Sequence, residues 1–328
     1  MVNGGEKKHI DSLKYFLGDV YDLLERPDIT DIEINSGASH VFVEGVKGRE
    51  KTGIVINRPN MIAFLNKIAS MKDSTITQEH PTLSAILPRE LFNCRLEASI
   101  PPITPEPGPS IVIRKPGMDF PITDYVNDEI QELLVQHLLN KSNILICGST
   151  SSGKTSFLNS LIGELVRVSP DERPIIMEDE HEVNCSFENH EYLFTVKTEK
   201  NQSWSMAENV KKSLRKNPDR IIVGEVRGIE AKEVLNAWDT GHVGGFCTLH
   251  AGGARQGFMR FFRMAELAWD NPLDQMFAGE AIDLILFLSK GPDGRKVREI
   301  VRVEFNYDTA IMRPEFLTIY PKTKPNQS

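Results

Sequence analysis

The sequence predicts a two-domain protein, in which a smaller α+β domain precedes an α/β domain. The chain has 328 residues, and at about 150 residues per domain this length favours two domains. The first hundred residues contain short runs in which apolar and polar residues alternate, the pattern of half-buried strands. From Asp128 onward, helical periodicity and continuous apolar strands take turns, which is α/β patterning.

The N-terminal domain is predicted over residues 1–116. Strands are expected around Ile32–Ile34 and Val41–Glu44, where apolar residues recur at every second position. One helix is expected between them and the later strands, because Pro59 can occupy a first helical turn and an apolar face follows. Five prolines in residues 101–109 predict an extended loop, and Ile111–Arg114 predicts a short strand after it.

Residues 117–127 are assigned to an interdomain linker, and residues 128–328 to the C-terminal domain. A helix is expected from Asp128, and a second one after the capping-box pattern Ser205–Glu208. Short apolar runs predict strands covered by helices on both faces. These runs are Ile144–Cys147, Ile175–Met177, Ile221–Val223, the glycine-rich Val243–Thr248 and Ile282–Leu288. A hairpin is expected through Gly291–Gly294.

Composition excludes several classes of protein. The net charge of −8 disfavours direct nucleic-acid binding, because proteins held to nucleic acid by their overall field are basic. No run approaches the roughly 18 apolar residues of a membrane span, and the N-terminus lacks the apolar core of a signal peptide, so a cytoplasmic protein is expected. The four cysteines form no C-x-x-C pair, which predicts free thiols and no zinc element.

A phosphate-binding loop is the strongest local signal. Gly148–Thr155 fits the pattern G-x-x-x-x-G-K-[ST], directly after a predicted strand and before an apolar-periodic helix. Backbone N–H groups of such a loop converge on phosphate oxygens, and the following helix N-terminus adds its positive end. Lys154 would neutralise the β- and γ-phosphates of ATP, and Thr155 would offer its hydroxyl to Mg²⁺. The predicted cradle comprises Gly148, Ser149, Thr150, Ser151, Ser152, Gly153, Lys154, Thr155 and Ser156.

Two acidic strand ends complete a hydrolase pattern. Glu178 ends the run Ile175–Met177, and Glu225 follows the run Ile221–Val223. A charge at the end of a buried strand is costly without a partner, so a metal-bound water or an arginine is expected beside each carboxylate. Thr155, Glu178 and Glu225 are therefore the predicted Mg²⁺ or metal-water contacts. His250, at the end of a further strand, is a weaker candidate for a contact with the γ-phosphate.

Taken together, the motifs resemble those of the secretion-ATPase superfamily, and within it the hexameric traffic ATPases of type IV secretion and conjugative transfer. The resemblance rests on the phosphate loop, Ile176–Asp179, Leu214–Arg227, Thr240–His242 and Thr248–Ala251, in that order. Asp31–Asn35, Arg95, Pro101–Pro102 and Ile113–Pro116 resemble the N-terminal domain of that family. The resemblance implies a RecA-like C-terminal domain.

The resemblance also implies residue roles. Glu225 becomes the catalytic glutamate, Glu178 the acidic-box carboxylate, and His250 the histidine near the γ-phosphate. Arg227, Arg215 and Arg260 match arginines of the family's conserved segments, and Arg95 and Arg114 match N-domain arginines that reach the nucleotide. Glu180–His181 and Gly252–Gly253 depart from the family pattern, so loop contacts there are not carried over.

The implied function is Mg²⁺-dependent ATP hydrolysis that drives conformational work in a type IV secretion or conjugative DNA-transfer apparatus. The implied assembly is a ring-shaped homo-hexamer that contacts membrane-embedded channel components from the cytoplasmic face of the inner membrane. One alternative is an ATPase of type IV pilus extension or retraction or of type II secretion. The second is a nucleotide-gated scaffold that binds ATP without turnover, against which the presence of Glu178, Glu225 and His250 argues.

Overall fold

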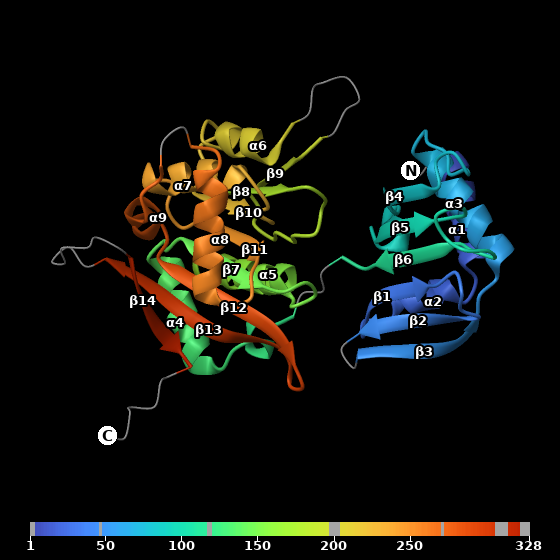
Figure 1. Cartoon of the computed structure of the whole chain (residues 1–328), viewed down its shortest axis with the longest axis horizontal. Helices are drawn as coiled ribbons and strands as arrows, with labels where there is room; N and C mark the ends of the chain where they lie inside the picture. Colours follow the sequence, from blue (N-terminus) through green and yellow to red (C-terminus); the bar gives the residue numbers. More distant parts are fainter. Residues whose placement is uncertain are drawn as a thin grey trace. The chain divides into compact units, whose positions relative to one another are not determined.

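The computed structural model describes residues 4–45, 48–116, 120–196, 204–269, 272–305 and 314–321. The chain divides into two compact units, Met1–Met118 and Asp119–Ser328 (Figure 1). Within the described ranges, no helix has both the length and the apolar character that a bilayer crossing requires.

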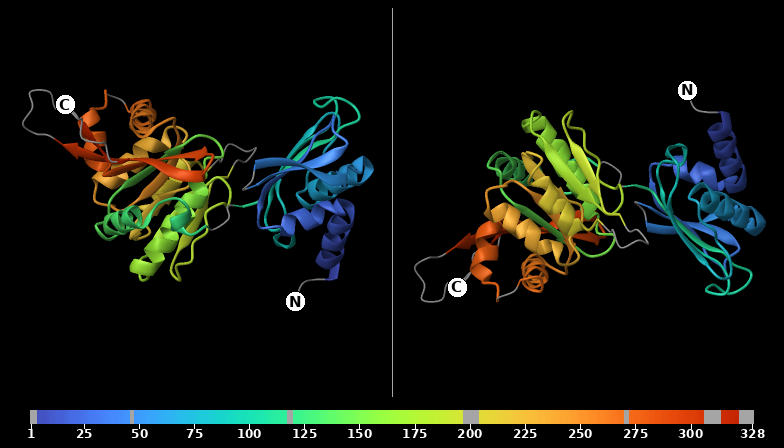
Figure 2. Two further views of the ribbon diagram at one scale, coloured as in Figure 1. Left: turned by 90° about the horizontal axis from the view of Figure 1, so that it is seen from below. Right: turned by 90° about the horizontal axis from the view of Figure 1, so that it is seen from above.

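The first unit is built on a six-stranded sheet in the order β3-β2-β1-β6-β5-β4, with every neighbouring pair antiparallel. Its strands are β1 (Ile29–Ile34), β2 (His40–Gly45), β3 (Gly48–Val55), β4 (Thr82–Ile86), β5 (Arg95–Ser99) and β6 (Ser110–Arg114). Helices α1 (Gly4–Leu17), α2 (Val20–Glu25) and α3 (Arg58–Met71) lie on one face of this sheet (Figure 2). A single-turn helix, η1 (Arg89–Leu91), follows β4.

The helices of this unit differ in number from the sequence prediction. The sequence predicts one helix, which is α3, and the side chain of Asn57 caps it by accepting a hydrogen bond from the N–H of Asn60 at 3.2 Å. Helices α1 and α2 were not predicted. They form because Leu13 and Leu17 of α1 lie four residues apart, and Val20 and Leu24 of α2 likewise, and all four are buried in the core of this unit.

The second unit is built on an eight-stranded sheet in the order β14-β13-β12-β7-β11-β10-β8-β9. Its strands are β7 (Ile144–Gly148), β8 (Pro174–Glu178), β9 (Glu191–Phe194), β10 (Arg220–Val223), β11 (Phe246–His250), β12 (Leu284–Gly291), β13 (Gly294–Phe305) and β14 (Pro314–Tyr320). Neighbours from β12 to β9 are parallel, whereas β12–β13 and β13–β14 are antiparallel. The carboxyl ends of β7, β8, β10 and β11 therefore meet at one edge of the sheet.

Helices cover both faces of this sheet, as the α/β pattern predicts. One face carries α4 (Asp128–Leu139) and α5 (Lys154–Val168). The other carries α6 (Met206–Ser213), α7 (Glu230–Asp239), α8 (Ala254–Glu266) and α9 (Gln275–Ala281). Successive residues of β7 point to opposite faces: Ile144 and Ile146 belong to the first core, Leu145 and Cys147 to the second. The α/β prediction for this part of the chain is confirmed.

The segment assigned to the linker differs from the expectation. Residues 117–119 lie outside the described residues. Residues 120–127 belong to the second unit, where they form the short helix η2 (Ile122–Asp124). Tyr125 is buried, with its ring 5.3 Å from that of Phe157, so this stretch is held by the core and does not link freely.

Two strand predictions need correction. The glycine-rich strand begins at Phe246 and not at Val243, because Gly244 has φ +81°, a conformation outside the strand region. The strand expected from Ile282 begins at Leu284, because Ile282 closes helix α9. The four cysteines are free thiols, as predicted.

Candidate active site

The phosphate loop joins the carboxyl end of β7 to the amino end of α5. A Cβ atom on Gly148 would lie 2.3 Å from Ser152 Oγ and 2.7 Å from the carbonyl oxygen of Leu288, so no side chain fits there. Gly153 has φ +89°, a left-handed conformation that glycine adopts without steric cost. Both glycines of the motif are therefore required by local packing and backbone shape. The N–H groups of the loop and of the first turn of α5 together offer an anion site.

Lys154 places its ammonium group at this loop. Its Nζ donates to the carbonyl oxygens of Ser149 at 3.1 Å and Gly148 at 3.3 Å, and lies 3.3 Å from His250 Nδ1. Burial lowers the pKa of Lys154, and the nearby Glu225 carboxylate opposes that shift. Lys154 is thus a largely buried cation. The Glu225 carboxylate, at a neighbouring strand end, partly offsets the cost of burying this charge.

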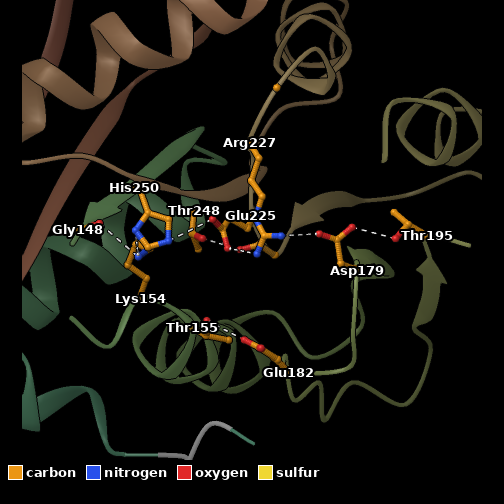
Figure 3. Close-up of polar contacts among 12 residues, drawn as sticks. Gly148, Lys154, Thr155, Asp179, Glu182, Thr195, Glu225, Arg227, Thr248 and His250 are labelled. Carbon is orange, nitrogen blue, oxygen red and sulfur yellow. Dashed lines mark hydrogen bonds and ion pairs between the residues drawn. The ribbon is translucent and has the colours of Figure 1, made fainter. Parts of the chain in front are cut away.

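Side chains from neighbouring strand ends form one connected row (Figure 3). His250 Nε2 lies 3.2 Å from Glu225 Oε1, and Arg227 Nη2 donates to Glu225 Oε2 at 2.8 Å. Arg227 also reaches Asp179, with Nη1 3.1 Å from Oδ2. The row runs from Lys154 through His250, Glu225 and Arg227 to Asp179, so cations and anions alternate around a histidine.

The charges in this row set the protonation of its members. Burial alone would raise the pKa of Glu225, but the hydrogen bond and charge of Arg227, with His250 and Lys154, lower it overall. Burial and the Lys154 charge lower the pKa of His250, so its imidazole is neutral at pH 7. An ammonium only donates and a carboxylate only accepts, so the histidine carries its proton on Nε2.

Glu178 lies at the end of β8 in a different environment. The side chain is buried, and its Oε1 accepts hydrogen bonds from the N–H groups of Glu182 at 3.1 Å and Val183 at 2.8 Å. Its Oε2 is also buried and has no hydrogen-bond partner among the described residues. The nearest cationic candidate is His181, whose Nδ1 is 3.6 Å from Oε2, beyond hydrogen-bonding distance. Burial raises the pKa of Glu178 to about 8.

Thr155 has an acidic neighbour that the sequence reasoning did not single out. Its Oγ1 lies 3.5 Å from Glu182 Oε2 (Figure 3). Glu182 comes four residues after Glu178 in the same acidic run. That position in the sequence is the one feature that could have identified Glu182 as a further candidate. Asp179 was also missed, and only the strand order that brings β8 beside β10 places it next to Arg227.

The remaining predicted residues fall into two groups. Ser149, Thr150 and Ser151 lie in the loop and Ser156 in the first turn of α5, and their contact with a nucleotide stays a prediction. Arg260, on α8, is exposed, and its charge contributes to the low pKa of His250. Arg215 follows α6 and is exposed.

Arg95 and Arg114 belong to the first unit. They lie opposite each other on the antiparallel strands β5 and β6. Arg114 Nε donates to Asp31 Oδ1 at 2.7 Å, and Arg95 Nε lies 3.5 Å from Glu97 Oε1. Each arginine therefore has a carboxylate of its own sheet as a neighbour, and a contact with a nucleotide stays a prediction.

A separate cavity of about 630 Å³ lies along α5, between its residues Asn159 to Glu164 on one side and, on the other, the loop that contains His181 and the strand residue Tyr192 of β9. Its lining includes none of the predicted site residues. The candidate site therefore lies at the phosphate loop, where the two motif glycines, the buried Lys154 and the Glu225 carboxylate paired with Arg227 come together.

The residues present fit a magnesium nucleotide. The glycines leave a backbone cradle that a Cβ atom would fill, and Lys154 supplies the cation beside it. Hydroxyl and carboxylate oxygens, the donors that Mg²⁺ prefers, are present at Thr155, Glu182, Glu178 and Glu225. The unpartnered buried oxygen of Glu178 is the group that most needs such a neighbour.

Comparison with known proteins gives consistent matches. The family model described as "Type II/IV secretion system protein" matches residues 65–286. A probable conjugal transfer protein, TrbB of Sinorhizobium fredii, is 35% identical over 245 residues, which is 73% of each chain. The type IV secretion system protein VirB11 of Brucella suis is 27% identical over 314 residues, 86% of this chain and 84% of its own.

Among solved structures, the ATPase DotB of Legionella pneumophila aligns with a TM-score of 0.63 at 21% identity, covering 88% of this chain and 80% of its own. At this identity the likeness concerns the fold. It confirms the predicted fold class, a RecA-like α/β domain preceded by a smaller α+β domain.

Proposed function

The chain belongs to the type II/IV secretion system protein family, among the traffic ATPases of type IV secretion and conjugation, and from this premise we propose that it hydrolyses ATP with Mg²⁺. The observation that carries the proposal is the connected row at the phosphate loop. Lys154 Nζ is 3.3 Å from His250 Nδ1, and His250 Nε2 is 3.2 Å from Glu225 Oε1. A carboxylate kept ionised within reach of a phosphate cradle suits water activation.

Each residue has a distinct task in this proposal. The loop N–H groups and Lys154 bind the β- and γ-phosphates, and Glu225 orients the attacking water with assistance from Glu178. His250 holds the Glu225 carboxylate and the Lys154 ammonium in register. Thr155 with the acidic groups would hold Mg²⁺, which neutralises charge on the phosphates when bound. Arg227 keeps Glu225 ionised.

The wider function extends this chemistry to mechanical work. A homo-hexameric ring, docked on membrane-embedded channel components at the cytoplasmic face of the inner membrane, would relay nucleotide-dependent movements to a secretion or conjugation channel. Arg95 and Arg114 would approach the nucleotide when the first unit covers it. Family membership supports this proposal, as does the match to a conjugal transfer protein over most of the chain.

Phosphate release by the full chain with Mg²⁺ and ATP tests the proposal. Lys154→Ala should abolish both ATP binding and turnover, because it removes the cation from the cradle. Lys141→Ala is the matched control: this lysine lies near Glu172 and outside the phosphate loop, so activity should persist. Hydrolysis at the wild-type rate in Lys154→Ala would refute the assignment of the loop. ATP binding without phosphate release by the unmodified chain would instead support a nucleotide-gated scaffold.

A further inference from the structure

The hairpin between β12 and β13 lies against the phosphate loop. Strand β12 runs parallel to β7, with Leu288 opposite Gly148, and continues beyond that pair to Gly291. The chain then turns back, so that Arg295 pairs with Lys290 across the hairpin. Because β7 stops where its loop begins and β12 does not, the hairpin extends past the sheet edge beside the loop.

Arg295 makes the contact between hairpin and loop. Its Nε donates to the carbonyl oxygen of Ser151 at 3.2 Å. Its Cδ would lie 2.8 Å from a Cβ on Gly153, so the aliphatic stem of the arginine covers that glycine. Ser151 and Gly153 both have positive φ, +59° and +89°. One side chain therefore touches the two left-handed residues on which the shape of the loop depends.

The positive charge of Arg295 is not neutralised by a carboxylate in the described part of the chain. No acidic side chain among the described residues forms an ion pair with it, whereas Arg298, on the same strand, pairs with Asp293 at 2.8 Å. Its guanidinium has five N–H donors, and the bond to Ser151 uses one. An uncompensated cation thus lies beside a loop that would receive a polyphosphate.

We propose that Arg295 is a positioning residue of the phosphate loop, which holds Ser151 and Gly153 in the nucleotide-binding shape and thereby sets nucleotide affinity rather than the rate of the chemical step. The inference rests on the proposed function. It follows from the geometry, because Arg295 contacts the loop backbone on the β12 side, whereas Glu225 and His250 follow β10 and end β11 on the other side of β7.

The test measures ADP affinity and steady-state ATP hydrolysis on the full chain. Arg295→Ala should raise the Kd for ADP and the KM for ATP by about tenfold, the size expected for one charge-assisted hydrogen bond, and should leave kcat within about twofold. Arg295→Lys keeps a cationic donor on a similar stem and should recover most of the affinity. Arg298→Ala removes an arginine of the same strand that is paired with Asp293, and should leave Kd and KM unchanged.

The outcomes separate this inference from the proposed function. If the wild type hydrolyses ATP and Lys154→Ala abolishes binding and turnover, while Arg295→Ala and Arg295→Lys bind ADP like the wild type, the proposed function stands and the role of Arg295 is refuted. A fall in kcat at unchanged KM would overturn the positioning role, because Arg295 would then act on the chemical step. Equal loss of affinity in Arg298→Ala would assign the effect to the whole hairpin. Melting temperatures show whether the alanine variant is folded, and the lysine variant keeps the test valid if it is not.

Discussion

At the scale of single residues, the two strand-end carboxylates differ in protonation. The cations Arg227 and Lys154, with His250, lower the pKa of Glu225 against the effect of its burial, whereas burial raises the pKa of Glu178 to about 8. Two acidic groups whose environments push their pKa values apart take different roles in catalysis. In the proposed mechanism, the ionised Glu225 is therefore assigned the orientation of the water, and Glu178 would need a bound cation to take that role.

This difference gives a prediction for variants. Glu225→Gln should bind ATP but hydrolyse it at least about a hundredfold more slowly, because the phosphate cradle remains while water orientation is lost. The measurements are ATP affinity and single-turnover phosphate release. Glu233→Gln is a suitable control, because that α7 carboxylate pairs with Lys211 at 3.2 Å and with no member of the row. Normal turnover in Glu225→Gln with an inert Glu178→Gln would reverse the two roles.

A second prediction concerns pH and Glu178 without metal or nucleotide. The ordinary pKa of this carboxyl is 4.5, and burial raises it to about 8 in the folded chain. Between these values the folded state holds a proton that the unfolded state has lost, so stability falls as pH rises. Glu178→Gln removes this dependence. Denaturant unfolding should show the variant gaining stability over the wild type from about pH 5 to pH 8 and no further above it. Parallel pH profiles would contradict the raised pKa.

At the scale of secondary-structure elements, Arg220 joins the start of β10 to its surroundings. Its side chain is completely buried and pairs with Glu172, while its Nη atoms donate to the carbonyl oxygens of Leu138 at 2.7 Å and Gly244 at 3.0 Å. Helix α4, the turn before β11 and strand β10 thus meet at one guanidinium. This end of the sheet lies opposite the phosphate loop, so the contact serves folding rather than chemistry.

Arg220→Ala should therefore lower the free energy of unfolding by about 3–5 kcal/mol, because it leaves Glu172 without its buried partner and two carbonyl oxygens unsatisfied. Urea unfolding measures this change. Arg215→Ala, five positions earlier and exposed, should alter stability by no more than about 0.5 kcal/mol. A loss at position 220 that does not exceed the loss at position 215 would show that the buried pair contributes little.

At the scale of the whole molecule, the question is whether the first unit takes part in nucleotide binding. Arg114→Ala in the full chain should weaken ATP binding with a small change in melting temperature, if its charge faces the phosphates. Arg49→Ala is the matched control, because Arg49 is an exposed arginine of the same sheet that pairs with Glu33 and Glu44. If Arg114→Ala lowers the melting temperature and leaves affinity unchanged, the arginine serves only its pair with Asp31.

The proposed motor also requires assembly. Mass measurement in solution with a non-hydrolysable ATP analogue should give a species of six chains, and dilution below the assembly range should reduce ATP turnover per chain. Phosphate release measured across the same dilution series supplies the comparison. A monomer that hydrolyses ATP at the full rate at every concentration would refute the ring mechanism.

The sequence alone determined the features that depend on local order. The phosphate loop, its flanking strand and helix, and the α/β alternation were predictable because glycine conformation, capping and apolar periodicity act over a few residues. Tertiary structure decided which distant groups meet: Glu182 beside Thr155, Asp179 beside Arg227, and Arg295 beside Ser151. Strand order in the sheet produces these contacts, and no local pattern encodes which parallel strand lies next to which. For the same reason, the stretch after the proline-rich loop has the local pattern of a linker, whereas the packing of Tyr125 on Phe157 makes it part of the second unit.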